Sequence, residues 1–131
     1  MPWCGSARQS EMTTPAVFSR SASRSMDKMA ISAPTPCKIG LSGQAGWIAY
    51  RRGGTVLVKR ATYHEGATYP DFGASLQCYS GGDFIEIETL GPLVSLAPGA
   101  SVDHRETWTL HAVDETMGSD DVMALLGLGG T

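Results

Sequence analysis

The fold of this chain is decided by the stretch Gly82-Asp-Phe-Ile-Glu-Ile-Glu-Thr-Leu-Gly-Pro-Leu-Val-Ser-Leu-Ala-Pro-Gly99, which alternates apolar and polar residues between turn residues. Side chains alternate across a β-strand, so Ile85 and Ile87 share one face while Glu86 and Glu88 share the other. A strand of this kind lies either on an ordinary sheet surface or along the wall of a polar cleft. Both interpretations stay open from the sequence.

The composition is that of a small globular protein with an acidic body. Of its 131 residues, 42% are hydrophobic and 18% are charged, and this length allows at most one domain. Residues 1–36 hold four basic and two acidic side chains, and the remainder holds six basic and eleven acidic ones. Phosphate backbones require clustered positive charge, so we expect no nucleic-acid partner. No apolar stretch approaches the roughly 18 residues that span a membrane, so we expect no membrane association.

The three cysteines, Cys4, Cys37 and Cys78, are far apart in the sequence. They form neither a disulfide framework nor the C-x-x-C pair of a metal site, and no His, Asp or Glu cluster has metal-ligand spacing. We therefore predict no metal and no cofactor, and we expect Cys78 to be a small core residue of a strand. Since no signal-peptide segment is visible, we expect a cytoplasmic protein.

The chain divides into two parts by composition. Residues 1–36 are rich in serine, methionine and proline and show no strand or helix periodicity, which is typical of a low-complexity segment. We expect this part to be a disordered arm, or an unrelated segment from an incorrectly assigned start, followed by a β-sandwich domain over 37–131. A transit peptide is the alternative, but Glu11 and Asp27 count against it.

Two glycine pairs predict two β-hairpins. Gly53-Gly54 joins strands over 46–51 and 55–60, which places Lys59 opposite Ile48. Because this hairpin is apolar on both faces, we expect it inside a larger sheet.

The second hairpin is predicted by the same argument. Gly81-Gly82 joins strands over 74–79 and 83–89 and places Cys78 opposite Ile85. A strand over 93–96 and another over 106–111 are expected to follow. Short strands separated by turns about every ten residues predict an all-β fold, an antiparallel β-sandwich.

A short helix is predicted near the C-terminus. Ser119, followed by Asp120 and Asp121, is typical of an N-cap with acidic residues in the first turn. The helix would run to about Leu126, where Gly127 would stop it. A helix this short is not stable alone, so we expect it to dock on the sheet.

The segment from Lys38 to about His111 contains a series of phrases that together carry a resemblance. They are Lys38-Ile-Gly, Gly46-Trp-Ile-Ala-Tyr, Val58-Lys59, Ala67-Thr-Tyr-Pro-Asp71, Glu86-Ile-Glu-Thr-Leu-Gly-Pro-Leu93, and Leu96-Ala-Pro-Gly99 through Glu106-Thr-Trp-Thr-Leu110. In these phrases the chain resembles the C-terminal part of galactose-mutarotase-like (aldose-1-epimerase-like) proteins, in an uncharacterised branch of that superfamily. The resemblance implies a β-supersandwich of which this chain is a C-terminal fragment, since the members are considerably longer.

The resemblance implies a sugar or sugar-phosphate ligand and an isomerase activity. Glu88-Thr89-Leu90 stands where the enzymes carry Glu-Thr-Gln, whose glutamate is the base, although the third residue differs. Glu88 is therefore the candidate base, and Glu86 is a second carboxylate on the same face. The histidine pair that serves as acid in mutarotases has no match here, so the acid would be either His64, from the loop over 61–73, or an upstream residue.

The candidate substrate-binding residues are Lys59, Tyr63, Tyr69 and Asp71. Lys59 falls on an apolar face, where it needs a partner such as Glu86 or Glu88 across the sandwich, or a ligand, or a route to water. The loop over 61–73 mixes aromatic rings with carboxylates, which suits sugar recognition, although Asp71 could instead fix the turn.

Three functions stay open from the sequence. The first is an aldose-epimerase-like isomerase that uses Glu88. The second is a non-catalytic carbohydrate-binding β-sandwich that uses the aromatic loop and Lys59. The third is a truncated product without independent activity, whose open sheet edges would favour self-association.

Overall fold

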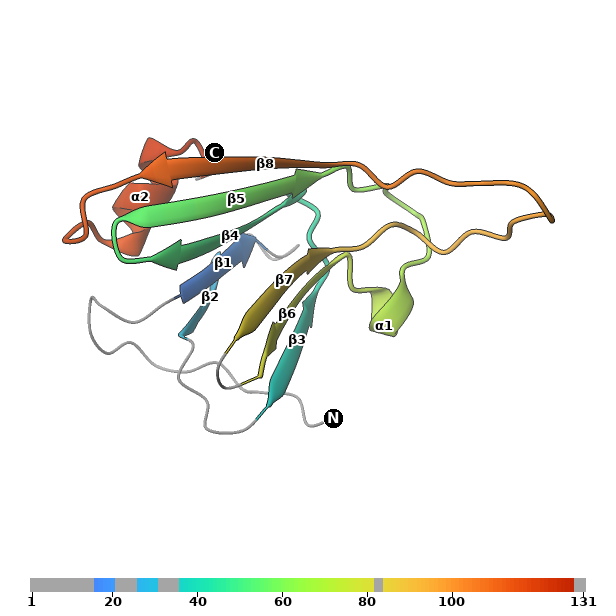
Figure 1. The fold of residues 1–131 in the computed structure, drawn as a ribbon, viewed down its shortest axis with the longest axis horizontal. Coiled ribbons are helices and arrows are strands. Elements are labelled where there is room, and N and C mark those ends of the chain that lie inside the picture. The colour runs from blue at the N-terminus through green and yellow to red at the C-terminus, as the bar shows by residue number, and fades with distance from the viewer. Residues whose placement is uncertain (1–15, 21–25, 31–35, 82–83, 129–131) are drawn as a thin grey trace.

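The computed structural model describes residues 16–20, 26–30, 36–81 and 84–128. These residues form two antiparallel sheets, a single helical turn and a short C-terminal helix (Figure 1). The expectation of a mostly β fold with antiparallel sheets and a short helix near the C-terminus is confirmed.

The larger sheet has five strands in the order β2-β1-β4-β5-β8, and the smaller one has three in the order β3-β6-β7. The strands of the larger sheet are β1 (Ala16–Arg20), β2 (Met26–Ala30), β4 (Trp47–Arg52), β5 (Thr55–Ala61) and β8 (Glu106–Ala112). Those of the smaller sheet are β3 (Cys37–Leu41), β6 (Leu76–Ser80) and β7 (Ile85–Thr89). The helical turn α1 (Pro70–Gly73) precedes β6, and the helix α2 (Ser119–Leu125) follows β8.

The five-stranded sheet extends into the segment over 1–36, for which the sequence shows no strand periodicity. β1 pairs with β4, where Phe18 lies opposite Ala49, and β2 pairs with β1. Strand pairing is made by backbone N–H and C=O groups, so it does not require an alternating side-chain pattern. The rest of the predicted low-complexity segment, at 1–15, 21–25 and 31–35, lies outside the described residues.

The first hairpin forms as predicted. Ile48 lies opposite Lys59 and Arg52 lies opposite Thr55, so Gly53-Gly54 is the two-residue connection. Gly53 has a φ of 55°, which glycine adopts without steric cost. β4 and β5 are flanked by β1 and β8, which confirms that this hairpin lies inside a larger sheet.

The second hairpin keeps the predicted faces but not the predicted register. Cys78 lies opposite Ile87, not opposite Ile85. The Gly81 N–H donates a 2.9 Å hydrogen bond to the Phe84 carbonyl, so the chain reverses one residue later than predicted. A side chain at Gly81 would collide with the Phe84 ring, which explains why the glycine lies opposite Phe84. Moving a turn by one residue shifts the register by two, and this leaves every side chain on its face.

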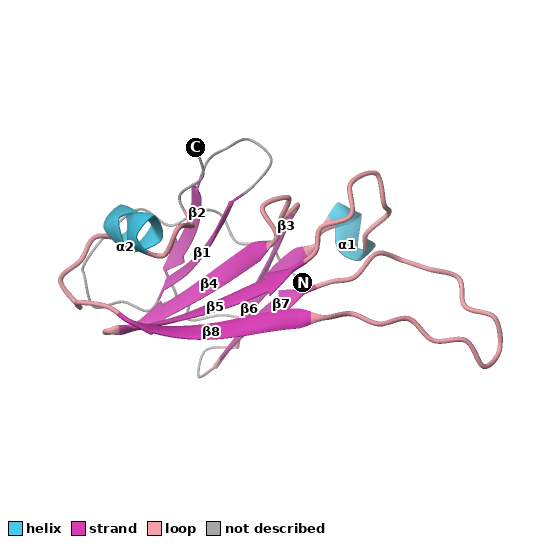
Figure 2. Cartoon of the chain, turned by 90° about the horizontal axis from the view of Figure 1, so that it is seen from above, coloured by secondary structure: helices cyan, strands magenta, loops and turns pink. Residues whose placement is uncertain are grey.

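A long exposed arm over 91–105 connects β7 to β8 and extends beyond both sheets (Figures 1 and 2). The predicted strand over 93–96 is wrong, because this segment lies in the arm, away from the strands with which it could pair. The arm contains a turn at Pro98-Gly99. The Ala100 N–H donates to the Ala97 carbonyl at 3.0 Å, and Gly99 has the positive φ of 83° that a type II turn requires.

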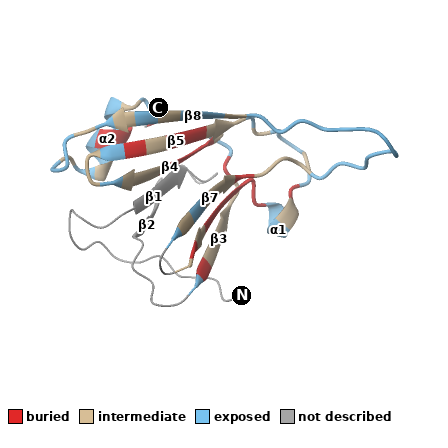
Figure 3. Ribbon diagram, viewed as in Figure 1, coloured by how far each residue is buried: buried red, intermediate tan, exposed pale blue. Residues whose placement is uncertain are grey.

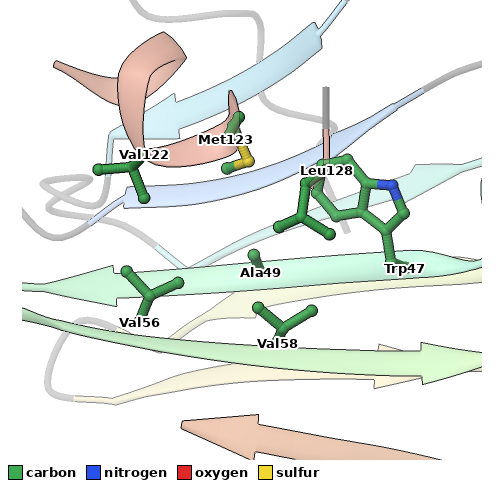
Figure 4. Packing of buried hydrophobic residues seen from close by; sticks show 7 residues of the cluster. All are labelled: Trp47, Ala49, Val56, Val58, Val122, Met123 and Leu128. Atoms are coloured by element: carbon green, nitrogen blue, oxygen red, sulfur yellow. The ribbon is translucent and has the colours of Figure 1, made fainter. Parts of the chain in front are cut away.

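Two hydrophobic clusters hold the layers together. Between the sheets, Ile48 packs with Leu76 and Cys78. Cys78 is 2% exposed, which confirms it as a core residue, and this burial raises the pKa of its thiol to about 12. On the other face of the five-stranded sheet, α2 packs on β4 and β5, and Figure 4 shows the seven side chains that meet there. The buried residues gather in β4, β5, β6 and α2 (Figure 3).

The helix α2 docks on the sheet as predicted, but it is capped differently at its start. The extended backbone that an N-cap needs falls at Gly118 (φ −62°, ψ 157°), so Ser119 is already helical and the predicted Ser119 cap is wrong. At the other end, Leu128 N–H donates to the Met123 carbonyl at 2.8 Å and Gly127 N–H to the Ala124 carbonyl at 3.1 Å. These two bonds, with a φ of 65° at Gly127, form a Schellman motif that ends the helix as predicted.

Helix docking can be tested with two substitutions on α2. Met123 is 2% exposed against the sheet, so Met123→Ala should lower the free energy of unfolding by about 2–4 kcal/mol. Leu125 is 62% exposed on the same helix, so Leu125→Ala should change it by less than about 0.5 kcal/mol. Urea unfolding measures both values, and equal losses would contradict this packing.

Candidate functional site

Polar side chains cover the face of the three-stranded sheet that points away from the five-stranded sheet, and we call it the outer face. The strand register sets them in two rows across β3, β6 and β7. One row is Gly40, Gln77 and Glu88, and the other is Lys38, Tyr79 and Glu86.

Both predicted catalytic glutamates lie on the outer face. Glu86 is exposed and Glu88 is half-buried. Ile85 and Ile87, which alternate with them, pack into the cluster between the sheets. The glutamates therefore point away from Lys59, and the predicted pairing of Lys59 with either of them across the sheets is wrong.

The turn α1 places Asp71 over the outer face. Its carboxylate accepts a hydrogen bond from the buried Gln77 amide and forms an ion pair with Lys38 Nζ at 3.2 Å. The Gln77 hydrogen bond and then Lys38 lower the pKa of Asp71 from its usual value. Asp71 and Phe72 have φ angles of 49° and 64°, a left-handed conformation that is uncommon outside glycine. An unusual backbone conformation thus places Asp71 where its carboxylate contacts two residues of the outer face.

The loop between β5 and α1 holds three further candidates. Tyr63 and Tyr69 stack with ring centroids 5.4 Å apart and planes at 6°. Tyr69 is buried, and its hydroxyl accepts a 2.9 Å hydrogen bond from the backbone N–H of His64. Tyr69 therefore supports the loop, while the His64 side chain is exposed.

Lys59 lies between the sheets and is only 7% exposed. Its ammonium donates to the Ile87 carbonyl at 2.9 Å, pairs with Glu106 Oε1 at 3.0 Å and lies 4.7 Å from the centroid of the Trp108 ring. An ammonium has three donors, and here each has an acceptor, the ring face included. A ligand could bind Lys59 only by displacing one of these groups.

Glu106 is the centre of a network that was not predicted from the sequence. Its carboxylate accepts hydrogen bonds from Thr89 Oγ1 at 2.5 Å and from Trp108 Nε1 at 2.7 Å. Thr89 Oγ1 also lies 2.7 Å from His104 Nε2, and since the single hydroxyl proton points to Glu106, His104 is the donor there. Burial raises the pKa of Glu106, but the hydrogen bonds from Thr89, Lys59 and Trp108 and the Lys59 charge outweigh it, and the net shift is downward.

One pattern in the sequence pointed toward this network. Glu106 and Trp108 alternate onto one face of β8, but only the pairing of β5 with β8 places them beside Lys59. That pairing joins segments separated by α1, β6, β7 and the arm, so no local pattern predicts it.

The candidates therefore fall into three places. Glu86, Glu88 and Asp71 share the outer face, Tyr63, His64 and Tyr69 share the loop, and Lys59 lies on the inner side of the three-stranded sheet. Within the described residues, no group of three or more His, Cys, Asp or Glu side chains could hold a metal ion. No helix in the same part of the chain is long and apolar enough to cross a membrane.

Comparison with known proteins gives no match: no family model, no curated protein and no solved structure matches this chain. The resemblance to galactose-mutarotase-like proteins therefore stays a prediction that depends on the quoted sequence phrases.

The lowered pKa of Glu106 predicts a dependence of stability on pH. A carboxyl whose pKa is lowered on folding stabilises the protein above its unfolded value, about 4.5, and this contribution is lost as pH falls through the folded pKa. Glu106→Gln should therefore be less stable than the unchanged protein at neutral pH, and the difference should shrink below about pH 4.5. Urea unfolding across this range measures the difference, and a constant difference would contradict the assignment.

Proposed function

We propose that this chain binds a carbohydrate on the outer face of the three-stranded sheet, as a protein of the galactose-mutarotase-like type. One observation carries the proposal, the position of Asp71 over this face. Gln77 and Lys38 hold the Asp71 carboxylate there, directly beside the rows that contain Glu86 and Glu88.

The chemistry of the outer face suits sugar hydroxyls, which both donate and accept hydrogen bonds. The carboxylates of Asp71, Glu86 and Glu88 are acceptors, and the Lys38 ammonium is a donor. Apolar surface is supplied by Tyr79 and Phe84, whose ring centroids lie 5.8 Å apart with planes tilted by 46°. Aromatic rings beside a few fixed polar groups are typical of small-molecule sites.

The backbone at α1 supports the choice of Asp71. Two consecutive residues other than glycine in the left-handed region cost about 1–3 kcal/mol each, and such residues cluster at functional sites. The strain is maintained here by the contacts of Asp71 with Gln77 and Lys38. A binding role gives these contacts a reason beyond the turn itself.

Isomerase activity is the second candidate function, favoured by the position of Glu88. Opening a sugar ring needs a base for the anomeric hydroxyl and an acid for the ring oxygen. Glu88 lies half-buried next to Gln77, within the group that Asp71 organises. His64 comes from the loop that leads into α1 and is the candidate acid.

A supersandwich belongs to the same proposal. In the described part of the chain, β3 and β7 are the edges of the smaller sheet, and β2 and β8 are the edges of the larger one. Further strands of a larger sheet, or a second copy of this chain, could pair with such edges.

Sugar binding can be tested by NMR titration of the isotope-labelled protein with a panel of aldoses. Asp71→Asn keeps the shape of the side chain and a residue type that tolerates positive φ, but removes the charged acceptor. It should weaken binding about tenfold or more, since hydrogen bonds to charged groups contribute about 1.5–3 kcal/mol. Asp120→Asn, on the exposed start of α2, is the matched control and should leave the affinity unchanged.

The same titration separates the two candidate functions. If Glu88→Gln abolishes the interconversion of anomers while sugar still binds, the isomerase is supported. If the unchanged protein binds sugar but interconverts none of the panel, it is a binding module. If no aldose in the panel causes a saturable shift of the NMR signals of outer-face residues, carbohydrate binding is refuted.

A further inference from the structure

An open depression of about 460 Å³ lies at one end of the five-stranded sheet. Its lining includes Arg60, Arg105, Thr107 and Tyr63. Arg60 alternates in phase with Val58, which packs under α2, so the depression opens on the sheet face that carries the helix. We call it the arginine groove. It is separate from the outer face, which belongs to the other sheet.

The strand register brings the two arginines together. Arg60 lies opposite Thr107 in the β5–β8 pair, and Arg105 directly precedes β8, two residues before Thr107. Both arginines line the depression, in the positions of diagonal neighbours if the strand is continued by one residue. Diagonal neighbours in an antiparallel pair lie about 7–8 Å apart, within reach of long side chains. The two guanidinium groups can therefore address one ligand from two sides.

Neither guanidinium has a partner within the described residues. The ion pairs there join Lys38 to Asp71 and Lys59 to Glu106. Arg51, by contrast, donates to the carbonyls of Asp114, Glu115 and Met117. Two neighbouring cations without a counterion repel each other, and a bound anion would remove that repulsion. This local positive charge stands out in a chain whose net charge is −3.

Two backbone segments that line the groove, at Gly46 and Ala61, are held together by a hydrogen bond. The Ala61 N–H donates a 3.0 Å hydrogen bond to the Gly46 carbonyl, and Gly46 has a φ of 71°. A methyl group on Gly46 would lie 2.8 Å from the Ala61 carbonyl oxygen, so only glycine allows this approach. The two segments that line the groove are thus held at a set distance.

We propose that the arginine groove binds a small molecule that bears a phosphate group. Arg60 and Arg105 hold the phosphate oxygens, because a planar guanidinium donates two parallel hydrogen bonds to such a group. The hydroxyls of Thr62 and Thr107, which also line the groove, add neutral donors. Tyr63, held by its stacking on Tyr69, offers a ring to the rest of the ligand.

The test uses inorganic phosphate and phenyl phosphate as probes, titrated into the full chain and followed by NMR. Arg60→Gln and Arg105→Gln should each weaken binding about tenfold or more and reduce its dependence on salt. Arg52→Gln removes the same charge from the exposed end of β4 and should leave binding within about twofold. Arg60→Lys keeps the charge and removes the paired donors, so it should also weaken binding, which keeps the test valid if Arg60→Gln does not fold.

Three results would overturn the proposal. One is the absence of saturable binding by either phosphate probe. Another is an equal loss of affinity in Arg52→Gln, which would indicate only the overall charge. The third is acetate binding as tightly as phosphate. Unchanged phosphate binding in Asp71→Asn is expected, and it separates this site from carbohydrate binding on the outer face.

Discussion

The Lys59 ammonium joins the two sheets, and the arrangement of the candidate sites depends on this contact. It extends from β5 of the larger sheet to the Ile87 carbonyl of β7, an edge strand of the smaller sheet, and to Glu106 of β8. A buried ammonium is costly unless each donor is satisfied, so the carboxylate, the carbonyl and the Trp108 ring must all be in place. Thr89 and His104 extend the same network to the base of the arm.

This contact lies on the inner side of β7, the side on which its isoleucines pack. With the Ile87 backbone held against Lys59, the isoleucines of β7 pack between the sheets and its glutamates face outward. Asp71 of α1 lies over the outer face, and the proposed carbohydrate site consists of Asp71 and the glutamates of that face. The arginine groove lies on the opposite side of the molecule, on the face of the larger sheet that α2 shares. Two different ligand chemistries are therefore proposed for two separate surfaces of one small fold.

Local patterns predicted those parts of the structure that depend on neighbouring residues. Gly53-Gly54 predicted the register of the first hairpin, alternation predicted the two faces of β7, and Gly127 predicted the end of α2. Features that depend on particular contacts between residues could not be predicted from these local patterns. The second turn lies one residue later than predicted, with the Phe84 ring beside Gly81, and the apolar residues over 93–96 form no strand because the arm extends away from the sheets.

The candidate site was predicted in its residue types more than in its contacts. Glu86, Glu88 and Asp71 share one face, but the hydrogen bond of Asp71 to Gln77 depends on a left-handed backbone that no residue type there demands. Lys59 was expected to need a partner, and it has one. The partner is Glu106, because β8 pairs directly with β5 whereas the β7 glutamates face the other way. Long-range strand pairing decided this point.

The most direct test of the central role of Lys59 is a double-mutant cycle with Glu106, measured by urea unfolding. Lys59→Met and Glu106→Leu each break the pair, and Glu106→Leu alone should lower the free energy of unfolding by about 3 kcal/mol or more, because it leaves a buried ammonium without its carboxylate. The double variant removes both charges and should lose at least about 1 kcal/mol less than the sum of the two single losses. Losses that add within about 0.3 kcal/mol would show that Lys59 and Glu106 are not coupled, which would contradict the central role of Lys59.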